Sequence, residues 1–120
     1  MARLYTIVPL PTGPFEHIDA LSRLCFGLIW DRYRVSSYNV TGTAGDSPWY
    51  DEDQEEVFCL YRQDELARDM GCSERTVRRC LETLREAGII WWRKAVYKGA
   101  NRYFVDPPIR EYLWPRREGK

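Results

Sequence analysis

The sequence of 120 residues contains a single histidine, His17, and no closely spaced pair of cysteines. Structural zinc sites usually take closely spaced pairs of ligands, so we expect no metal ion. The cysteines, which are Cys25, Cys59, Cys72 and Cys80, are most simply buried, reduced thiols of a cytoplasmic protein. No Ser-His-Asp arrangement, nucleophile elbow or phosphate-binding loop is present, so we expect neither catalysis nor a cofactor.

Long hydrophobic runs are also absent. The longest covers the seven residues 24–30, whereas a membrane-spanning helix needs about 20. The apolar start at 4–10 is short and runs into prolines, which argues against a secretory signal. We therefore expect a cytoplasmic protein with no membrane contact.

Net charge is the third quantity that the sequence lacks, because 18 Lys and Arg balance 18 Asp and Glu. The zero is a cancellation: residues 1–60 have four basic and nine acidic side chains, whereas 61–120 have fourteen and nine. A basic carboxyl-terminal half is typical of a protein with a polyanionic partner. The length and a hydrophobic content of 44% indicate one globular domain over 1–120.

The first third of the chain predicts an extended segment and a helix. Prolines keep 4–11 extended. Apolar residues at three- and four-residue steps predict a helix over 22–34, with Ser22 as its N-cap. Gly27 inside that helix costs about 1 kcal/mol relative to alanine, which indicates that something packs closely against it.

A loop and a hairpin are predicted next. Small and turn-forming residues dominate 35–48, which predicts a loop. Two short apolar segments, 49–50 and 57–60, then flank five acidic residues in the six positions 51–56. This pattern predicts a small β-hairpin with an acidic tip. The tip is either a solvated run or a cation site, and we expect it to face away from any polyanion that the chain binds.

The segment 63–88 predicts a helix-turn-helix. A short helix over 63–70 ends at Gly71, which can take the left-handed conformation of a helix C-terminus. Ser73 then caps a second helix over 74–87. The buried stripe of that helix is Val77, Cys80, Leu81 and Leu84.

A wing and a tail follow the helix-turn-helix. Residues rich in β formers at 89–94 and 102–105 flank a Gly-Ala-Asn turn, so we expect a wing over 89–105. The tail, 106–120, contains three prolines and at most a short helix around 109–113. The predicted fold class is therefore α+β and helix-rich: a winged helix-turn-helix with an N-terminal helix and small β-hairpins.

The second helix of a helix-turn-helix projects from the surface and fits the major groove of B-DNA. Its outward face and amino end supply the candidate DNA-binding residues of the recognition helix, namely Ser73, Glu74, Arg75, Thr76, Arg78, Arg79 and Arg85. The candidate DNA-binding residues of the wing are Arg93, Lys94, Lys98, Asn101 and Arg102. Residues 72–102 have eight basic and three acidic side chains, which favours a DNA partner.

The residue types suggest separate roles. Arginine can pair bidentately with guanine, so Arg75 and Arg78 are the expected base contacts. Ser73 and Thr76 would donate hydroxyls to phosphate, and Glu74 would accept from a cytosine amino group or complement the helix dipole. The wing cations would contact phosphate and make the affinity depend on salt. The same surface would also suit a solvated helix face or a protein-interaction module.

Two sets of motifs resemble known proteins. The first, Leu66-Ala67-x-x-Met70-Gly71-Cys72-Ser73-x-x-Thr76-Val77 with Leu84-x-x-x-Gly88-Ile89-Ile90, is similar to many bacterial winged-helix proteins. The amino half narrows the resemblance, through Tyr5-x-Ile7-Val8-Pro9, Leu21-Ser22, Gly27-Leu28-x-x-Asp31-Arg32, Ser36, Asn39, Trp49-x-Asp51-Glu52 and Val57. Over residues 4–105 the chain resembles the RepA N-terminal family of plasmid replication initiators.

The resemblance implies a winged helix that binds repeated sites in a replication origin, often as a homodimer, with a recognition helix at 74–87 and a wing at 93–102. It also implies a separate carboxyl-terminal domain that would contact replication proteins. On this interpretation the 120 residues are either an excised domain or a stand-alone relative on a mobile element. A small transcriptional regulator that binds a promoter operator would use the same fold. Five tryptophans and eight tyrosines are many for this length and predict an aromatic surface patch, which we interpret as the homodimer interface.

Overall fold

The computed structural model describes residues 5–38, 49–94 and 100–114. A 3-10 turn, Gly13–Phe15, precedes the long helix α1, Ala20–Tyr38. Three short strands follow, β1 (Tyr50–Asp51), β2 (Glu56–Val57) and β3 (Cys59–Tyr61). The remaining elements are α2 (Gln63–Met70), α3 (Glu74–Glu86), β4 (Ile90–Lys94), β5 (Asn101–Val105) and α4 (Pro107–Leu113).

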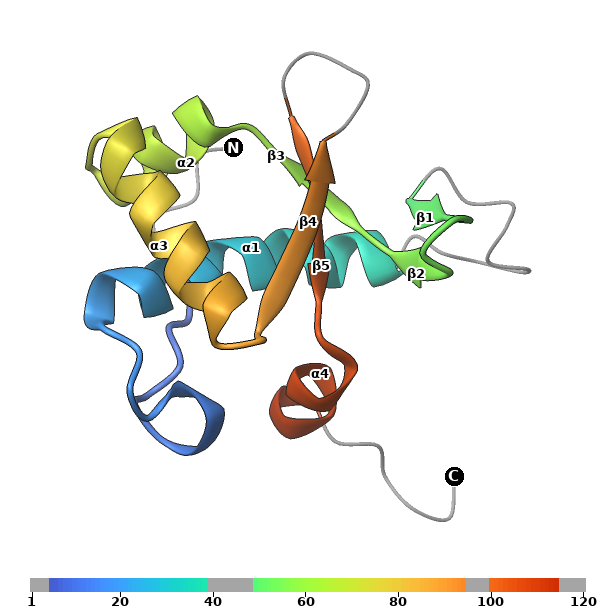
Figure 1. The fold of residues 1–120 in the computed structure, drawn as a ribbon, viewed down its shortest axis with the longest axis horizontal. Helices are drawn as coiled ribbons and strands as arrows, with labels where there is room; N and C mark the ends of the chain where they lie inside the picture. The colour runs from blue at the N-terminus through green and yellow to red at the C-terminus, as the bar shows by residue number, and fades with distance from the viewer. Residues whose placement is uncertain (1–4, 39–48, 95–99, 115–120) are drawn as a thin grey trace.

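The centre of the fold is a three-stranded antiparallel sheet in the order β3-β5-β4 (Figure 1). Its β4–β5 hairpin is the predicted wing. Strand β3 overlaps the predicted strand at 57–60, but the sequence did not indicate that it pairs with β5. The predicted hairpin over 49–60 is confirmed only for β1 and β2, since 59–61 leave it to join the central sheet. The fold is thus the expected helix-rich winged helix-turn-helix.

The sheet separates two hydrophobic clusters, because successive side chains of a strand point to opposite faces. One face packs on α1, α2 and α3 and includes Cys59 and Tyr103, both almost fully buried. On the other face, Trp91 stacks on Phe104 with ring centroids 5.1 Å apart, and Phe104 contacts Phe58 of the segment between β2 and β3. The hairpin β1–β2 therefore lies on the face of the sheet that the helices leave open.

Helix α1 differs from its prediction at both ends. The prediction of Ser22 as its N-cap is wrong: the Asp19 carboxylate accepts hydrogen bonds from the Ser22 backbone N–H (3.2 Å) and hydroxyl (2.7 Å). The predicted loop over 35–48 is wrong for 35–38, which continue the helix, since no glycine or proline there stops it. The rest of that loop, 39–48, lies outside the described residues.

The helix-turn-helix follows its prediction closely. Helix α2 ends at Gly71, whose φ of 71° is the left-handed conformation that glycine adopts without strain. Helix α3 begins after Ser73, whose side chain accepts from the Thr76 backbone N–H at 3.2 Å. The predicted stripe of α3, Val77, Cys80, Leu81 and Leu84, is buried. The short helix expected in the tail is also present as α4.

The tryptophans of the hairpin and the wing are less exposed than expected, since Trp49, Trp91 and Trp92 are all half-buried. The large apolar side chains that the described residues do expose lie mainly at the two ends of the chain: Tyr5, Ile7, Leu10, Val35, Tyr112 and Trp114. The predicted aromatic surface patch is therefore wrong for the strands, because Trp49 and Trp91 pack on Phe58 and Phe104, whereas Trp92 packs against the main core.

Close packing at Gly27 is confirmed. The extended segment at 5–10 crosses α1 there, and a Cβ added to Gly27 would lie 2.5 Å from the carbonyl oxygen of Ile7. The segment is held by a hydrogen bond from the Thr6 hydroxyl to the Gly27 carbonyl (3.4 Å) and by one from the Arg23 guanidinium to the Pro9 carbonyl (3.0 Å). Glycine at this position therefore permits the amino-terminal segment to dock.

Gly27→Ala should lower the free energy of unfolding by about 2 kcal/mol, because the backbone of Ile7 must move away from the new methyl group. The measurement is chemical denaturation followed by far-ultraviolet circular dichroism. In a variant that lacks residues 1–10 the clash partner is gone, so the same substitution should stabilise the helix by up to about 1 kcal/mol. An equal loss in both backgrounds would contradict the assigned contact.

Candidate nucleic-acid interface

The exposed face of α3 presents a row of arginines opposite its buried stripe. Arg75, Arg78, Arg79 and Arg85 are all exposed, as the period of the helix predicts. Arg75 and Arg78 have no ion-pair or hydrogen-bond partner among the described residues. Arg79 lies 3.7 Å from a carboxylate oxygen of Asp19, the residue before α1, and Arg85 pairs with Glu82. The uncompensated positive charge of α3 is thus concentrated in its first turn and a half.

The amino end of α3 is a hydrogen-bonded cap. The Ser73 and Thr76 hydroxyl oxygens lie 3.1 Å apart, and Ser73 accepts from the Thr76 backbone N–H. Both expected phosphate donors are therefore engaged with each other, although Ser73 is exposed. Glu74 is exposed in the first turn, where its charge complements the helix dipole.

The wing strands divide the predicted wing residues between the two faces of the sheet. Lys94 and Asn101 are direct cross-strand partners on the face that looks toward α2 and α3. Lys94 is exposed with no ion-pair partner among the described residues, and the Asn101 amide donates to the Tyr103 hydroxyl at 3.2 Å. Lys98 lies outside the described residues. Lys94 is therefore the described wing cation that is available to a ligand beside α3.

The other two wing cations, Arg93 and Arg102, are directly opposite each other on the far face of the sheet. Like charges in such a cross-strand pair repel. The buried carboxylate of Asp51 in β1 lies between them: one oxygen is 3.3 Å from the Arg93 guanidinium and the other is 2.9 Å from that of Arg102. Asp53 adds a second contact to Arg93 at 3.3 Å. Much of the positive charge of these two arginines is therefore compensated within the protein.

The acidic hairpin consequently packs against the wing. Asp51 is only 2% exposed, whereas Glu52, Asp53, Gln54 and Glu55 are exposed. The prediction of a solvated acidic run is thus wrong for Asp51, because two arginines and a buried position hold it on the sheet. That the run faces away from a bound polyanion stays a prediction. These arginines are 42 and 51 positions away in the sequence, so no local pattern could reveal the contact.

The pKa of Asp51 lies below its ordinary value of 3.8. Burial by itself would raise that pKa, but hydrogen bonds from the Gln54 backbone N–H and from Arg102 stabilise the carboxylate, as do the charges of Arg93 and Arg102. Asp51 is therefore ionised at neutral pH and holds both guanidinium groups.

The thiols show no arrangement for chemistry. Cys25, Cys59 and Cys80 are buried and Cys72 is half-buried, all as free cysteines. Burial raises the pKa of Cys59 to about 12, which keeps the thiol protonated. In the part of the chain that the structure describes, no group of His, Cys, Asp and Glu is placed to hold a metal ion. Nor, within the same ranges, is any helix long and apolar enough to cross a membrane.

The helix-turn-helix is supported by comparison with known proteins. Residues 49–90 match a family model described as a helix-turn-helix domain, a range that begins just before β1 and ends at the first residue of β4. No curated protein sequence matches the chain. The matched range contains α2, the turn and α3, in agreement with the helix-turn-helix that the structure shows.

Solved structures share the whole fold at low sequence identity. The chain is similar to the N-terminal domain of a DNA-binding protein, with 15% identity and a TM-score of 0.59 over 94% of this chain and 88% of that one. It is similar to a Rep–DNA complex, with 13% identity and a TM-score of 0.60 over 94% of this chain and 89% of that one. It is also similar to an MDR initiator, with 12% identity and a TM-score of 0.59 over 84% of this chain and 74% of that one. These likenesses establish a shared fold.

Asp51→Asn should lower the free energy of unfolding by about 2 kcal/mol at pH 7, because charge-assisted hydrogen bonds to two arginines are lost. The folded-state pKa of Asp51 is lowered, so its contribution is complete above the ordinary value of 3.8 and is lost as the pH falls through the folded-state pKa. Denaturation of both proteins from pH 7 down to pH 2 should show the difference shrinking below about pH 4.

Glu52→Gln is the matched control for Asp51→Asn. It makes the same change in net charge on a neighbouring exposed side chain that has no arginine partner among the described residues. Its effect on the free energy of unfolding should stay within about 0.5 kcal/mol. Equal effects of the two substitutions would show that overall charge, and not the Asp51 contact, stabilises the hairpin.

Proposed function

We propose that this domain binds double-stranded DNA sequence-specifically, with α3 in the major groove and the wing on the backbone. The observation that carries the proposal is the pair Arg75 and Arg78, exposed and without partners among the described residues at the amino end of a projecting helix. Arginines placed in this way can pair with guanine edges in the major groove. The exposed Lys94 on the adjacent wing strand supplies a phosphate contact beside them.

The charge distribution supports the same orientation. Arg79 and Arg85 are partly compensated by Asp19 and Glu82, and they lie farther from the amino end of α3. Arg93 and Arg102 face the other side of the sheet, where Asp51 holds them. In our proposal they position the wing, whereas Arg75, Arg78 and Lys94 meet the duplex.

The specific role that we propose is that of a replication-initiator-type domain that binds repeats in a plasmid or mobile-element origin. The fold shared with a Rep–DNA complex and an MDR initiator supports this role, as does the family resemblance of the amino half. A transcriptional regulator is the second candidate, because the same surface would bind a promoter operator. Footprinting on the replicon that encodes the chain separates them: protected repeats within an origin support initiation, and a protected promoter supports regulation.

We propose further that the domain acts as a homodimer, because two-fold symmetry suits paired half-sites on DNA. The side chains of Tyr5, Ile7 and Tyr112 at the two ends of the chain form exposed apolar surface that such an interface would bury. Size-exclusion chromatography with light scattering, on free protein and on its DNA complex, tests the proposal. A strict monomer at high micromolar concentration that also binds DNA with one copy per site would exclude the dimer.

Arg75→Ala and Arg78→Ala should each weaken binding to the specific site about 10-fold or more while changing non-specific affinity much less, since each loses a base contact. Fluorescence anisotropy with specific and scrambled duplexes provides the measurement. Arg34→Ala is the control, because it removes the same charge from α1, where Arg34 pairs with Asp31. Unchanged specific affinity in the double variant would show that α3 is not the recognition helix.

Lys94→Ala should weaken specific and non-specific binding alike and reduce the slope of log affinity against log salt by about one unit, the signature of one phosphate contact. The same result is predicted for Lys98→Ala. Arg93→Ala should change the slope less, because Asp51 and Asp53 already compensate its charge. A larger slope change for Arg93→Ala than for Lys94→Ala would place the DNA on the opposite face of the sheet.

A further inference from the structure

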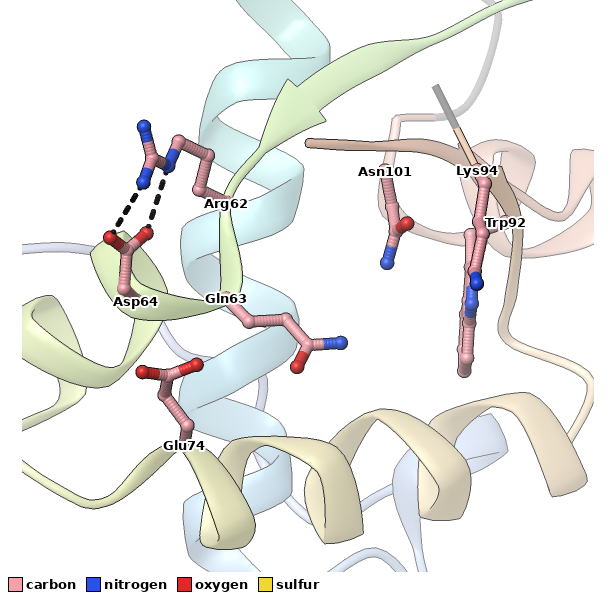
Figure 2. Close-up of a pocket in the computed structure, with 7 residues that line it drawn as sticks. All are labelled: Arg62, Gln63, Asp64, Glu74, Trp92, Lys94 and Asn101. Carbon is pink, nitrogen blue, oxygen red and sulfur yellow. Dashed lines mark hydrogen bonds and ion pairs between the residues drawn. The ribbon is translucent and has the colours of Figure 1, made fainter. Parts of the chain in front are cut away.

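A cleft of about 450 Å³ opens between the first residues of α2, the first residue of α3 and the wing strands (Figure 2). Its volume falls in the range of small-ligand sites. Seven residues line it: Arg62, Gln63, Asp64, Glu74, Trp92, Lys94 and Asn101. Four of them were not among the site residues that the sequence predicted, namely Arg62, Gln63, Asp64 and Trp92.

Several polar groups in the cleft lack partners. The Gln63 carboxamide, the Glu74 carboxylate, the Trp92 indole N–H and the Lys94 ammonium form no hydrogen bond with any described residue. Figure 2 shows the Gln63 and Asn101 carboxamides pointing into the space between α2 and the wing, with the Trp92 ring along the opposite side. The cleft thus offers donors and acceptors together with a flat aromatic surface.

The charges of the cleft balance. The Arg62 guanidinium donates two hydrogen bonds to Asp64, at 3.0 and 2.9 Å, and these hold the pKa of Asp64 below its ordinary value. Glu74 and Lys94 are the remaining two charges, of opposite sign. Two cations and two carboxylates leave the cleft without net charge, so the site favours a neutral, planar group with its own donors and acceptors.

The Trp92 ring is held in place from outside the cleft. The Arg85 guanidinium lies 4.5 Å from its centroid, and Tyr103 packs on it at 5.9 Å. An indole ring fixed in this way is a suitable stacking surface for a nucleobase. The nearby carboxylate of Glu74 is an acceptor that suits an exocyclic amino group.

We propose that this cleft binds one unstacked base of a DNA strand and prefers a base with an exocyclic amino group over thymine. The base stacks on Trp92, its amino group donates to Glu74, Gln63 and Asn101 contact its remaining edge, and Lys94 meets a neighbouring phosphate. The inference rests on the proposed function, since the cleft lies between the recognition helix and the wing. It adds to that function a binding mode for unpaired DNA, because a base must leave its stack to enter.

The test compares single-stranded dA, dC and dT decamers by fluorescence anisotropy. The wild-type protein should bind dA and dC at least about 5-fold more tightly than dT. Trp92→Leu should weaken binding of the dA decamer about 10-fold, as expected for loss of base stacking. Trp91→Leu is the matched control: Trp91 is the half-buried neighbour on the opposite face of β4, stacked on Phe104, and its loss should leave decamer binding unchanged.

Two substitutions at accessible positions keep the test independent of folding, since Gln63 is half-buried and Glu74 is exposed. Gln63→Ala should weaken binding of the dA decamer several-fold. Glu74→Gln should remove the preference over dT, because its amide can also donate to the thymine carbonyl. Equal affinities of wild-type protein for dA, dC and dT, or no effect of Trp92→Leu, would overturn the inference.

The source of the base is tested with free dAMP. If dAMP binds as tightly as the dA decamer, the site takes a free nucleotide, and the inference about a DNA strand fails. The Arg75→Ala/Arg78→Ala double variant separates this inference from the proposed function: it should lose specific duplex binding and keep its preference for dA over dT. Specific duplex binding without any base preference among decamers would leave the proposed function intact and overturn only the inference.

Discussion

Strand β5 is the element on which the rest of the structure depends. Its two edges pair with β3, which precedes the helix-turn-helix, and with β4, which follows it. The alternation of its side chains sends Tyr103 into the core beneath the helices and Arg102 and Phe104 to the other face. A shift of one residue in this register would exchange the two sets and place a guanidinium in the main core.

Both faces of β5 are therefore completed by residues distant in sequence. On one face the helices cover Tyr103. On the other, Asp51 neutralises the repulsion between Arg93 and Arg102, while Phe58 and Trp91 cover Phe104. The acidic hairpin and the basic wing form one packed unit, which explains how a chain without net charge still presents a basic surface. Among the described residues of α3 and the wing, the cations without an ion-pair partner are Arg75, Arg78 and Lys94.

The features that the sequence predicted correctly are those that one residue and its near neighbours determine. Gly71 ends α2 because only a left-handed residue closes that turn without strain, and Ser73 begins α3 because its hydroxyl caps the helix. The strands of the wing and the close contact at Gly27 were predicted for similar reasons. The helix start at Asp19 was missed, since two capping residues compete within four positions and the choice between them depends on the preceding turn.

Contacts between distant segments were not predictable from the same patterns. The pairing of β3 with β5 depends on the tertiary fold, because the pattern of 57–60 fits the second strand of a local hairpin equally well. The same limit applies to Asp51, whose role depends on two arginines brought together by strand register. Of the candidate site, the exposed arginines of α3 followed from helical periodicity, whereas the cleft formed by Gln63, Glu74 and Trp92 depends on how α2 meets the wing.

The pairing of both flanking strands with β5 also limits how α3 can move. Helices α2 and α3 connect β3 to β4, and both strands belong to the central sheet, so the pair of helices is anchored at both ends. Such a helix cannot tilt without disturbing the strand that bears Lys94. The distance between the exposed arginines of α3 and the wing is consequently a fixed property of the domain, and any ligand that spans both must match that distance or deform to do so.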